Sequence, residues 1–354
     1  MRVGLSMLTL VPGVVGGSET YARALCRGLA RVDEVDATAF LPTLAPDAGG
    51  DLPTVVVDEY RASTSTPGRL AAMVRGSVAS GSLRTPFAGL DVVHYPLTTP
   101  IPPLDLPTVV TLHDVQHLDL PQLFGRGERL FRRVFYDRAS RRADLVLVPS
   151  EFVRERAIAR LGLDPARVRV CPHGVDHDAF RPGDGGRERF LLYPAKTWPH
   201  KNHERLLAAF ALLHAEEPDL RLVLTGGGTE KLAGPLGVET RGLVPADELA
   251  GLFRRAAALV FPSLHEGFGT PVLEAMASGT PVAAARAGSL PEVCGDAAVL
   301  FDPQDPEAIA AGVREALSRS DELRAAGIAR AATFTWEASA RSHADAYREA
   351  STRS

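Results

Sequence analysis

Cysteine, long apolar runs and excess positive charge are all scarce in this sequence. Its three cysteines, Cys26, Cys171 and Cys294, lie far apart at spacings that fit neither a metal site nor a disulfide, and they indicate a reducing compartment. No run of uninterrupted apolar residues approaches the roughly 18 that indicate a membrane-spanning helix, so we expect none. The net charge of −4 gives no reason to expect nucleic acid as a partner.

The N-terminal residues also lack the features of a secretory signal. The segment MRVGLSMLTLVPGVVGG has one basic residue, an apolar run broken by Pro12 and no small-x-small cleavage site. We interpret it as a buried strand and a glycine-rich loop, followed by a helix from Glu19 to Ala30 that Ser18 caps. The loop lacks the G-x-G-x-x-G pattern, which argues against a dinucleotide, and we expect a cytoplasmic protein.

Length and patterning predict two α/β domains. The chain has 354 residues, 45% of them hydrophobic and 23% charged, which suits a soluble protein with two domains of about 150 to 200 residues. Short apolar runs alternate with helical patterns, which implies parallel sheets covered on both faces. The strands predicted in the first half are Arg2–Met7, Ala37–Leu41, Thr54–Val57, Asp91–Tyr95, Thr108–Leu112, Leu145–Val148 and Val168–Cys171. Those predicted in the second half are Phe190–Pro194, Leu220–Thr225, Ala256–Phe261, Pro281–Ala284 and Val299–Asp302.

The stretch from Phe261 to Gly279, FPSLHEGFGTPVLEAMASG, carries the clearest chemistry. We predict the end of a buried strand, a polar loop and a short helix, with Thr270 as the N-cap and Pro271 at the first helical position. Two carboxylates, Glu266 and Glu274, have seven residues between them. A loop of little bulk before a helix N-terminus favours anions, and carboxylates beside it accept hydrogen bonds from hydroxyl groups. The alternative interpretation is purely structural: Glu266 is a charged residue of a surface loop, and Glu274 only complements the helix dipole. The loop residues whose backbone N–H groups a ligand could reach are Gly267, Phe268 and Gly269.

The string EGFGTPVLEAMASGTPV resembles the E-x7-E signature of retaining glycosyltransferase family 4, and the resemblance extends over essentially the whole chain. It implies the GT-B fold, in which two Rossmann-like, doubly wound parallel-sheet domains face each other across a cleft. We place an acceptor domain at residues 1–183 and a donor domain at 184–335, with the GDGG segment Gly183–Gly186 at the boundary. A terminal helix at about 336–354 would cross back onto the first domain.

In the first half, the resemblance assigns roles to a glycine pair and a histidine. Gly16 and Gly17 match the segment that lies near the donor phosphates in the family. His113 follows the Thr108–Leu112 strand, at the edge where open parallel sheets bind ligands. It would contact the transferred sugar through a neutral imidazole, whereas Asp114 would hold the loop or the imidazole.

In the second half, the resemblance assigns the donor site. Lys201 matches the family lysine on the donor pyrophosphate, and Lys196 stands where the family commonly has arginine, whose bidentate fork a lysine cannot make. Gly226 matches a segment that binds the nucleotide in the family. Leu243 lies in Arg241–Val244, which matches a short strand and turn whose backbone meets the base. Glu274 would bind the ribose hydroxyls, while Glu266 and the N–H groups of the loop would bind the sugar hydroxyls. The implied donor-binding set is Gly16, Gly17, Lys196, Lys201, Gly226, Leu243, Glu266, Gly267, Phe268, Gly269, Thr270 and Glu274, and the implied catalytic residues are His113, Glu266 and Lys201.

The function that the resemblance implies is retaining transfer of a hexosyl group from a nucleoside diphosphate sugar to a glycan, glycolipid or small-molecule hydroxyl. The amino-acid sequences of the motifs most resemble those of mannosyltransferase-like members, which favours a GDP-mannose-like donor over a UDP- or dTDP-sugar. No Asp-x-Asp motif is placed to hold a divalent ion, so we expect neither a catalytic metal nor another cofactor. Two alternatives stay open: a sugar-nucleotide epimerase or hydrolase on the same fold, and a non-catalytic sugar-nucleotide-binding subunit.

Two further segments of the first half bear on partners. Residues 126–142 (RGERLFRRVFYDRASRR) carry seven arginines with apolar residues at helical spacing. They fit either a basic amphipathic helix that meets an anionic membrane or phosphorylated acceptor, or a surface helix whose apolar stripe packs on the sheet. Glu128 and Asp137 dilute the charge and favour the second interpretation. Arg61 to Phe87 is rich in Ser, Thr, Gly and Arg, and we expect a mobile excursion there that helps to choose the acceptor.

Overall fold

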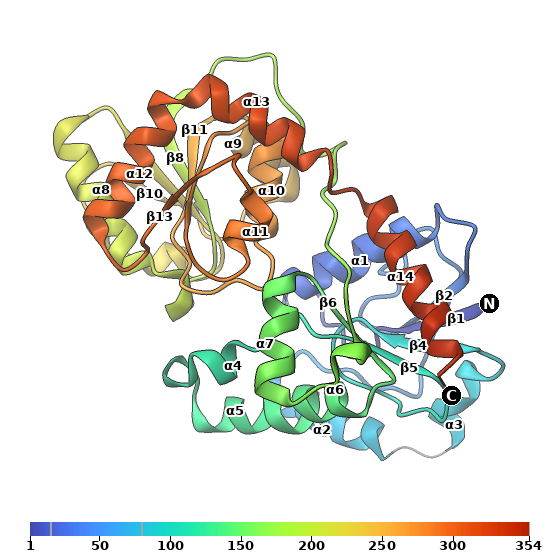
Figure 1. Ribbon diagram of the computed structural model, residues 1–354. Helices are drawn as coiled ribbons and strands as arrows, with labels where there is room; N and C mark the ends of the chain where they lie inside the picture. Colours follow the sequence, from blue (N-terminus) through green and yellow to red (C-terminus); the bar gives the residue numbers. More distant parts are fainter. Residues whose placement is uncertain (15, 79–80, 354) are drawn as a thin grey trace. The chain divides into compact units, whose positions relative to one another are not determined.

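The computed structural model describes residues 1–14, 16–78 and 81–353 and divides into two compact units (Figure 1). Unit 1 comprises Met1–Gly174 and Trp336–Ser354, and unit 2 comprises Val175–Thr335. Each unit contains one parallel sheet, as the alternation of apolar runs and helical patterns predicts.

The sheet of unit 1 has the strand order β3-β2-β1-β4-β5-β6-β7, and all neighbouring pairs are parallel. This order places β1 beside β4, with the chain winding outward in both directions from that pair, as in doubly wound sheets. The strands are nearly continuous apolar runs because helices cover both faces. Their bounds are β1 Arg2–Ser6, β2 Asp36–Leu41, β3 Thr54–Val56, β4 Val92–Tyr95, β5 Thr108–Thr111, β6 Leu145–Val148 and β7 Val168–Val170.

The helices of unit 1 come from both ends of the chain. The terminal helix α14 (Trp336–Ser351) packs against α1 (Gly17–Leu29), and Figure 1 shows the two side by side. The segment expected to be a mobile excursion contains α2 (Thr66–Ser77), α3 (Gly81–Arg84) and the 3-10 turn η1 (Thr85–Phe87). The remaining elements are α4 Gln116–Asp119, η2 Pro121–Leu123, α5 Arg126–Arg132, the π-helical turn η3 Arg133–Asp137, α6 Arg138–Arg142, α7 Glu151–Leu161 and η4 Pro165–Arg167.

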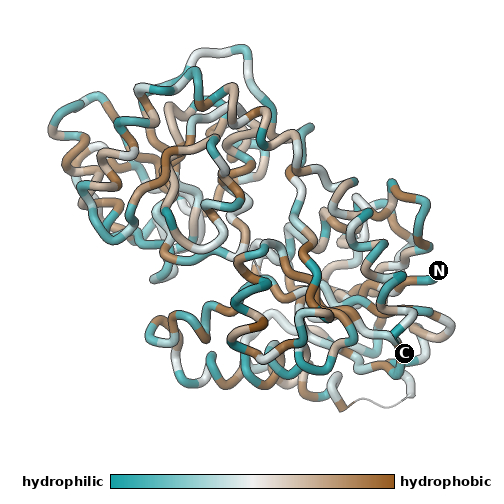
Figure 2. Tube along the Cα trace, viewed as in Figure 1, coloured by the Kyte–Doolittle hydropathy of each residue, from teal (hydrophilic) through white to brown (hydrophobic). Residues whose placement is uncertain are grey.

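Residues 126–142 form one continuous helix, built from α5, η3 and α6, and its apolar stripe is only half packed. Phe131 and Phe135 lie against the buried cluster that includes Tyr60 and Ile101. Leu130 and Val134, in contrast, are 60% and 45% exposed. The expectation that the whole stripe packs on the sheet is therefore wrong for half of it. Figure 2 shows hydrophobic positions interrupting the hydrophilic trace of this helix.

The sheet of unit 2 has the strand order β10-β9-β8-β11-β12-β13, again with parallel pairs throughout. The bounds are β8 Glu188–Pro194, β9 Arg221–Thr225, β10 Val238–Thr240, β11 Ala256–Phe261, β12 Val282–Ala285 and β13 Val299–Phe301. The segment Arg241–Val244, for which the resemblance implies a short strand and a turn, contains only the turn. Strand β10 ends before it at Thr240, because Gly242 adopts the left-handed conformation (φ +62°) and turns the chain.

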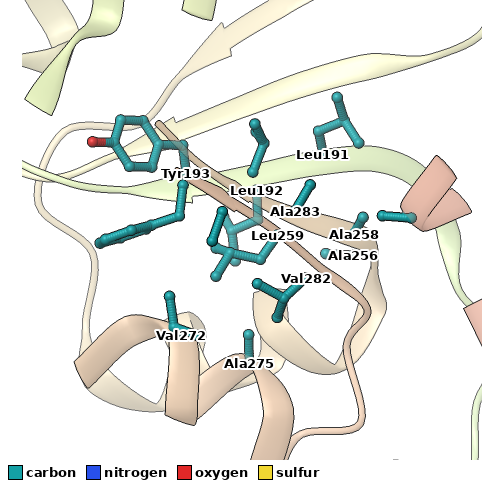
Figure 3. Close-up of a cluster of buried hydrophobic side chains, with 14 of the residues drawn as sticks. Leu191, Leu192, Tyr193, Ala256, Ala258, Leu259, Val272, Ala275, Val282 and Ala283 are labelled. Atoms are coloured by element: carbon teal, nitrogen blue, oxygen red, sulfur yellow. The ribbon is translucent and has the colours of Figure 1, made fainter. Parts of the chain in front are cut away.

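Helices cover both faces of the unit 2 sheet. Figure 1 shows α8 and α12 on one side and α9, α10 and α13 on the other. Figure 3 shows Val272 and Ala275 of α10 directed at Leu259 and Val282 of the strands, so that α10 is anchored on the sheet by buried apolar side chains. The helices and turns are η5 Pro199–Lys201, α8 His203–Glu216, η6 Thr229–Lys231, α9 Ala246–Arg255, α10 Thr270–Ala277, α11 Leu290–Cys294, α12 Pro306–Ser318 and α13 Ser320–Ala331.

The division between the units falls at Gly174, ahead of the Gly183–Gly186 segment chosen from composition. Two contacts explain why the intervening residues belong to unit 2. The backbone N–H of Val175 donates to the carbonyl of Phe334 (3.1 Å), and the ring of Phe180 packs edge-on against Phe253 (5.6 Å between centroids). The two ends of unit 2 therefore lie next to each other.

Candidate functional site

The central loop joins β11 to helix α10 at the carboxyl edge of the unit 2 sheet. Gly269 has φ +90° and is the N-cap, so Thr270 and Pro271 are the first two helical residues; the prediction that Thr270 caps the helix is wrong by one position. A side chain at Gly269 would meet Leu290, since an added Cβ would lie 2.6 Å from its Cδ2. The helix ends at Ala277, and Gly279 adopts φ +69° just beyond it, as glycine commonly does after a helix.

A buried ion pair joins two of the predicted site residues. The Lys201 ammonium lies 2.5 Å from Glu266 Oε1, and the two side chains are only 14% and 11% exposed. Lys201 comes from the turn after β8, and Glu266 from the loop after β11, which pairs with β8 in the sheet. The structure thus brings together, at one sheet edge, the cation expected on the diphosphate and the carboxylate expected on the sugar.

Backbone and side-chain hydrogen bonds hold the Lys201 turn against the Glu266 loop. The Tyr193 hydroxyl donates to the carbonyl of Lys201 (2.7 Å), and the N–H of Leu264 donates to the carbonyl of His200 (2.8 Å). Asn202 takes a left-handed conformation (φ +61°) and donates from Nδ2 to the carbonyl of Pro262 (3.0 Å). The ion pair therefore rests on a rigid connection between the two loops.

Gly288 and Ser289 pack against the backbone of Glu266 and hold it in place. The Ser289 N–H and hydroxyl both donate to the carbonyl of Glu266, each at 3.2 Å. Gly288 has φ +61°, and an added Cβ would lie 2.6 Å from the nitrogen and 2.7 Å from the oxygen of Glu266. The segment Ala287–Val293 therefore packs against the backbone of a predicted site residue.

We therefore expect Gly288→Ala to destabilise unit 2 and displace Glu266. The left-handed conformation alone disfavours alanine by about 1–2 kcal/mol, and the clash is with backbone, which has no alternative rotamer. The thermal midpoint measured by calorimetry should fall by at least about 4 °C. Gly185→Ala is the matched control, because nothing lies within 4 Å of an added Cβ there. An unchanged midpoint for Gly288→Ala would contradict the support role.

A second part of the site is formed by the segment that follows β8, together with the turns at Gly226 and Gly242. Gly226 (φ +116°) lies so close to the Ala195–Lys196 peptide that an added Cβ would approach the Ala195 carbonyl carbon to 2.6 Å. The Gly226 N–H donates to the carbonyl of Gly242 (2.7 Å), which places Leu243, 75% exposed, at the same edge. The structure therefore gathers the predicted nucleotide-binding segments around Gly226.

Lys196 and Lys201 lie in consecutive backbone turns of this segment. The Trp198 N–H donates to the Lys196 carbonyl and the Lys201 N–H to the Trp198 carbonyl, both at 2.8 Å. The Lys196 ammonium lies 5.4 Å from the centre of the half-exposed Trp198 ring, a cation–π contact rather than an ion pair. The chain contains three lysines, at 196, 201 and 231, and uses arginine at its other basic positions, so two of the three fall at this site.

Glu274 lies one turn into α10 and is partly buried. Burial and, to a smaller extent, the negative charge of Asp176 together raise its pKa from 4.5 to about 7. A carboxyl that is about half ionised near neutral pH is an unusual group at a helix surface, and such groups concentrate at functional sites.

In unit 1, Gly16 and Gly17 begin helix α1. Gly16 (φ +63°) is the N-cap and Gly17 the first helical residue, so the helix starts two residues before the predicted Glu19 and Ser18 does not cap it. The Glu19 carboxylate instead accepts a hydrogen bond from the Gly13 N–H (2.8 Å) and closes the loop. An added Cβ at Gly17 would find open space, consistent with an accessible backbone.

His113 follows β5 in unit 1 and is held as a neutral imidazole. Its Nε2 donates to the carbonyl of Pro96 (2.9 Å), which leaves Nδ1 as the acceptor nitrogen, and burial lowers its pKa. Its ring packs edge-on against Tyr21 of α1 (5.0 Å between centroids). Asp114 accepts from the Gln116 N–H (3.0 Å) and pairs with Arg132 (3.3 Å), so it holds the loop, as expected.

Tyr21 is itself fixed by a buried network that reaches the terminal helix. Its hydroxyl contacts Thr111 Oγ1 (2.9 Å) and donates to His343 Nε2 (2.7 Å), because His343 Nδ1 donates to the Ser339 carbonyl (2.7 Å). Burial also lowers the pKa of His343, to about 4, so the network is uncharged at neutral pH. Helix α14 thereby contributes to the position of His113.

Sequence reasoning missed the residues that position the site rather than line it. These are Tyr193, Asn202, Gly288, Ser289, Asp176 and Tyr21. The turns at Asn202 and Gly288 could have been predicted from the sequence, since Asn and Gly are the residues that most readily adopt positive φ. Within the described ranges, no group of three or more His, Cys, Asp or Glu side chains could hold a metal ion, and metal independence stays a prediction.

Comparisons with known proteins agree with the architecture. Residues 176–333 match the family described as glycosyl transferases group 1, and residues 15–179 match the one described as Glycosyltransferase Family 4. A sucrose-phosphate synthase structure from Thermosynechococcus elongatus superposes with a TM-score of 0.77 at 22% identity, covering 99% of this chain and 98% of that one. At this identity the likeness shows the fold, which is that of GT-B glycosyltransferases.

Two curated relatives narrow the family. An MMP alpha-(1->4)-mannosyltransferase from Mycolicibacterium hassiacum is 37% identical over 202 residues, which cover 54% of this chain and 49% of that protein; the match thus spans about half of the relative. A D-inositol 3-phosphate glycosyltransferase 2 from Catenulispora acidiphila is 30% identical over 385 residues, covering 95% of this chain and 90% of that protein. The chain therefore belongs to glycosyltransferase family 4.

Proposed function

We propose that this protein is a retaining hexosyltransferase that uses a nucleoside diphosphate sugar, with a GDP-mannose-like donor favoured. The acceptor is a hydroxyl group of a glycan, a glycolipid or a small molecule, and the reaction takes place in the cytoplasm without a metal. The observation that carries the proposal is the buried Lys201–Glu266 pair at the sheet edge next to the start of helix α10. The mannosyltransferase among the relatives supports the choice of sugar.

The charges of the site suit a departing nucleoside diphosphate. An ammonium group has three donors, so Lys201 can keep its bond to Glu266 and also donate to a diphosphate oxygen. Lys196 supplies a second positive charge from the neighbouring turn. Cations fixed where negative charge develops stabilise the transition state without reorganising.

The remaining residues bind the donor's hydroxyl groups. Glu266 accepts from sugar hydroxyls beside the N–H groups of Phe268 and Gly269, and Glu274 accepts from the ribose. His113 Nδ1, the free acceptor nitrogen of a neutral ring, accepts from a hydroxyl of the transferred sugar. We assign no protein nucleophile: a donor phosphate oxygen takes the acceptor's proton as the acceptor attacks from the side that the diphosphate leaves.

A thermal-shift panel of GDP, UDP, dTDP and ADP tests the donor. A nucleotide at about 100 times its dissociation constant stabilises the folded protein by roughly 2.7 kcal/mol. We expect GDP to raise the midpoint most, and Glu274→Ala to reduce that shift. A larger shift with UDP or dTDP would replace the GDP assignment, and no shift with any of the four would contradict the donor site.

Product analysis separates the proposal from its alternatives. Incubation with the donor that binds should release nucleoside diphosphate only when a hydroxyl acceptor is present, and the product should keep the donor's anomeric configuration by NMR. Release or isomerisation without an acceptor would favour the hydrolase or epimerase. Binding without turnover would favour the sugar-nucleotide-binding subunit.

A further inference from the structure

A chain of five hydrogen bonds runs through the interior of unit 1 and joins helix α14 to three other elements. The Tyr347 hydroxyl of α14 lies 2.8 Å from His94 Nδ1 in β4, and His94 Nε2 lies 2.8 Å from Thr111 Oγ1 in β5. The chain continues through the Tyr21 hydroxyl of α1 to His343, which bonds to a backbone carbonyl of α14. No helix in the described ranges is long and apolar enough to span a bilayer, and α14 buries its apolar face in unit 1.

The direction of every bond in this chain follows from its last one. A carbonyl can only accept, so His343 donates to it from Nδ1, and Nε2 accepts the proton of the Tyr21 hydroxyl. The Tyr21 oxygen then accepts from the Thr111 hydroxyl, whose oxygen accepts in turn from His94 Nε2. This leaves His94 Nδ1 as the acceptor for the Tyr347 hydroxyl. Both imidazole tautomers are therefore fixed, with the proton of His94 on Nε2 and that of His343 on Nδ1.

The chain holds as many protons as bonds. Three hydroxyls and two neutral imidazoles supply five protons for the five bonds, so a sixth proton would leave one buried N–H or O–H group without an acceptor. Burial lowers the pKa of both His94 and His343, which keeps the two rings neutral near pH 7. Burial also favours the uncharged form of the other imidazoles and thiols around the chain, which are His113, His173, Cys26 and Cys171.

The middle of the chain lies next to His113. Thr111 comes two residues before His113 at the end of β5, and the Tyr21 ring packs edge-on against the His113 imidazole (5.0 Å between centroids). The Tyr21 hydroxyl is held from two sides, so its ring cannot turn without breaking bonds on both. His94 and Tyr347 are fully buried and cannot themselves contact a substrate.

We infer that His94 and Tyr347 are positioning residues of the transfer reaction. The hydrogen-bond chain that begins with them holds Tyr21, and Tyr21 holds the His113 imidazole with its Nδ1 toward the transferred sugar. The inference rests on the proposed function, which gives His113 its contact with the sugar. It extends the groups that determine activity to two side chains that are sealed from the site.

Long-range ¹H–¹⁵N NMR of the imidazoles in the full wild-type chain tests the direction of the bonds without reference to activity. At pH 7.5 we expect the proton of His94 on Nε2 and that of His343 on Nδ1. Tyr347→Phe removes the donor to His94 Nδ1, so the signal of that nitrogen should move toward its value in an unbonded ring. The opposite tautomer at either histidine, or a doubly protonated ring, would overturn the inference.

A double-mutant cycle tests the positioning role. Tyr347→Phe should lower kcat/KM about tenfold, because a small misplacement of a group at the reacting sugar has effects of this size. In a His113→Ala background it should have no further effect, since it acts through His113. Tyr60→Phe is the matched control, because it removes another buried tyrosine hydroxyl of unit 1 in the separate cluster with Phe40, and it should keep wild-type kinetics.

The kinetic outcomes separate the inference from the proposed function. An equal tenfold loss in the presence and absence of the His113 side chain would show that Tyr347 only stabilises the fold, and would overturn the inference. So would wild-type kinetics for Tyr347→Phe. A wild-type protein that transfers no sugar would contradict the proposed function, and the positioning role would fail with it.

Discussion

Lys201→Ala should lower kcat/KM by roughly 10²–10³-fold, the usual effect of removing one group that stabilises developing transition-state charge. The variant removes the cation proposed to bind the departing diphosphate. It also leaves the Glu266 carboxylate, 11% exposed, without its ion-pair partner, so its orientation toward the sugar is no longer fixed. Because the lost interaction strengthens as the bond to the diphosphate breaks, kcat should fall more than KM rises.

Lys231→Ala is the matched control for this experiment, since it removes the one lysine of the chain outside the site, an exposed residue of the turn η6. It should retain wild-type kinetics. Steady-state release of nucleoside diphosphate in the presence of acceptor measures both variants. A kcat/KM for Lys201→Ala within about threefold of wild type would show that the ammonium does not act on the leaving group.

Glu274→Gln should make the protein more stable above pH 7 while weakening nucleotide binding. The pKa of Glu274 is about 7 in the folded state, against 4.5 for an ordinary glutamate. Between these values the folded state holds a proton that the unfolded state has released, so this residue's contribution to stability is largest below pH 4.5 and is lost as the pH rises toward 7. The uncharged amide of glutamine does not lose stability in this way. For Glu274 the loss in the free energy of unfolding is roughly 3 kcal/mol at most.

The measurement is the thermal midpoint of both proteins from pH 5 to pH 8.5, without and with GDP. Without nucleotide, the difference should grow with pH and level off above about pH 7 at several degrees in favour of the variant. With GDP the order should reverse, because ribose hydroxyls donate to the carboxylate and favour its ionised form. The exposed Glu307→Gln serves as the control and should follow wild type. A pH-independent difference for Glu274→Gln would contradict the raised pKa.

Most of the fold could be predicted because strands buried on both faces leave a strong signal. β6 and β11 have the predicted bounds, and the bounds of the other predicted strands differ from the observed ones by at most two residues. The Ser150 hydroxyl oxygen caps α7 and accepts a hydrogen bond from the Val153 N–H (3.2 Å), in line with the preference of helices for serine at this position. These features depend on local patterning, which is visible in one sequence.

Features set by distant contacts could not be predicted. Gly269 displaces Thr270 as the N-cap because Leu290, 21 positions further on, occupies the space that a side chain would need. The support of Glu266 by Gly288 and the raised pKa of Glu274 near Asp176 depend equally on tertiary proximity. The half-exposed stripe of the 126–142 helix belongs to the same class, because spacing alone does not tell how wide a face the neighbouring elements cover.

The hydrogen bond between Val175 and Phe334 gives unit 2 the topology of an inserted domain. Its two ends meet, and unit 1 is completed only when the chain returns as helix α14. Unit 2 can therefore be excised as one contiguous segment or circularly permuted through a short linker between residues 175 and 335. A chain that ended ahead of Trp336 would lack helix α14. Tyr21 would then lose its hydrogen bond to His343, and the apolar surface of α1 would be exposed, so unit 1 needs this helix. During synthesis, unit 2 can fold before unit 1 receives its last element.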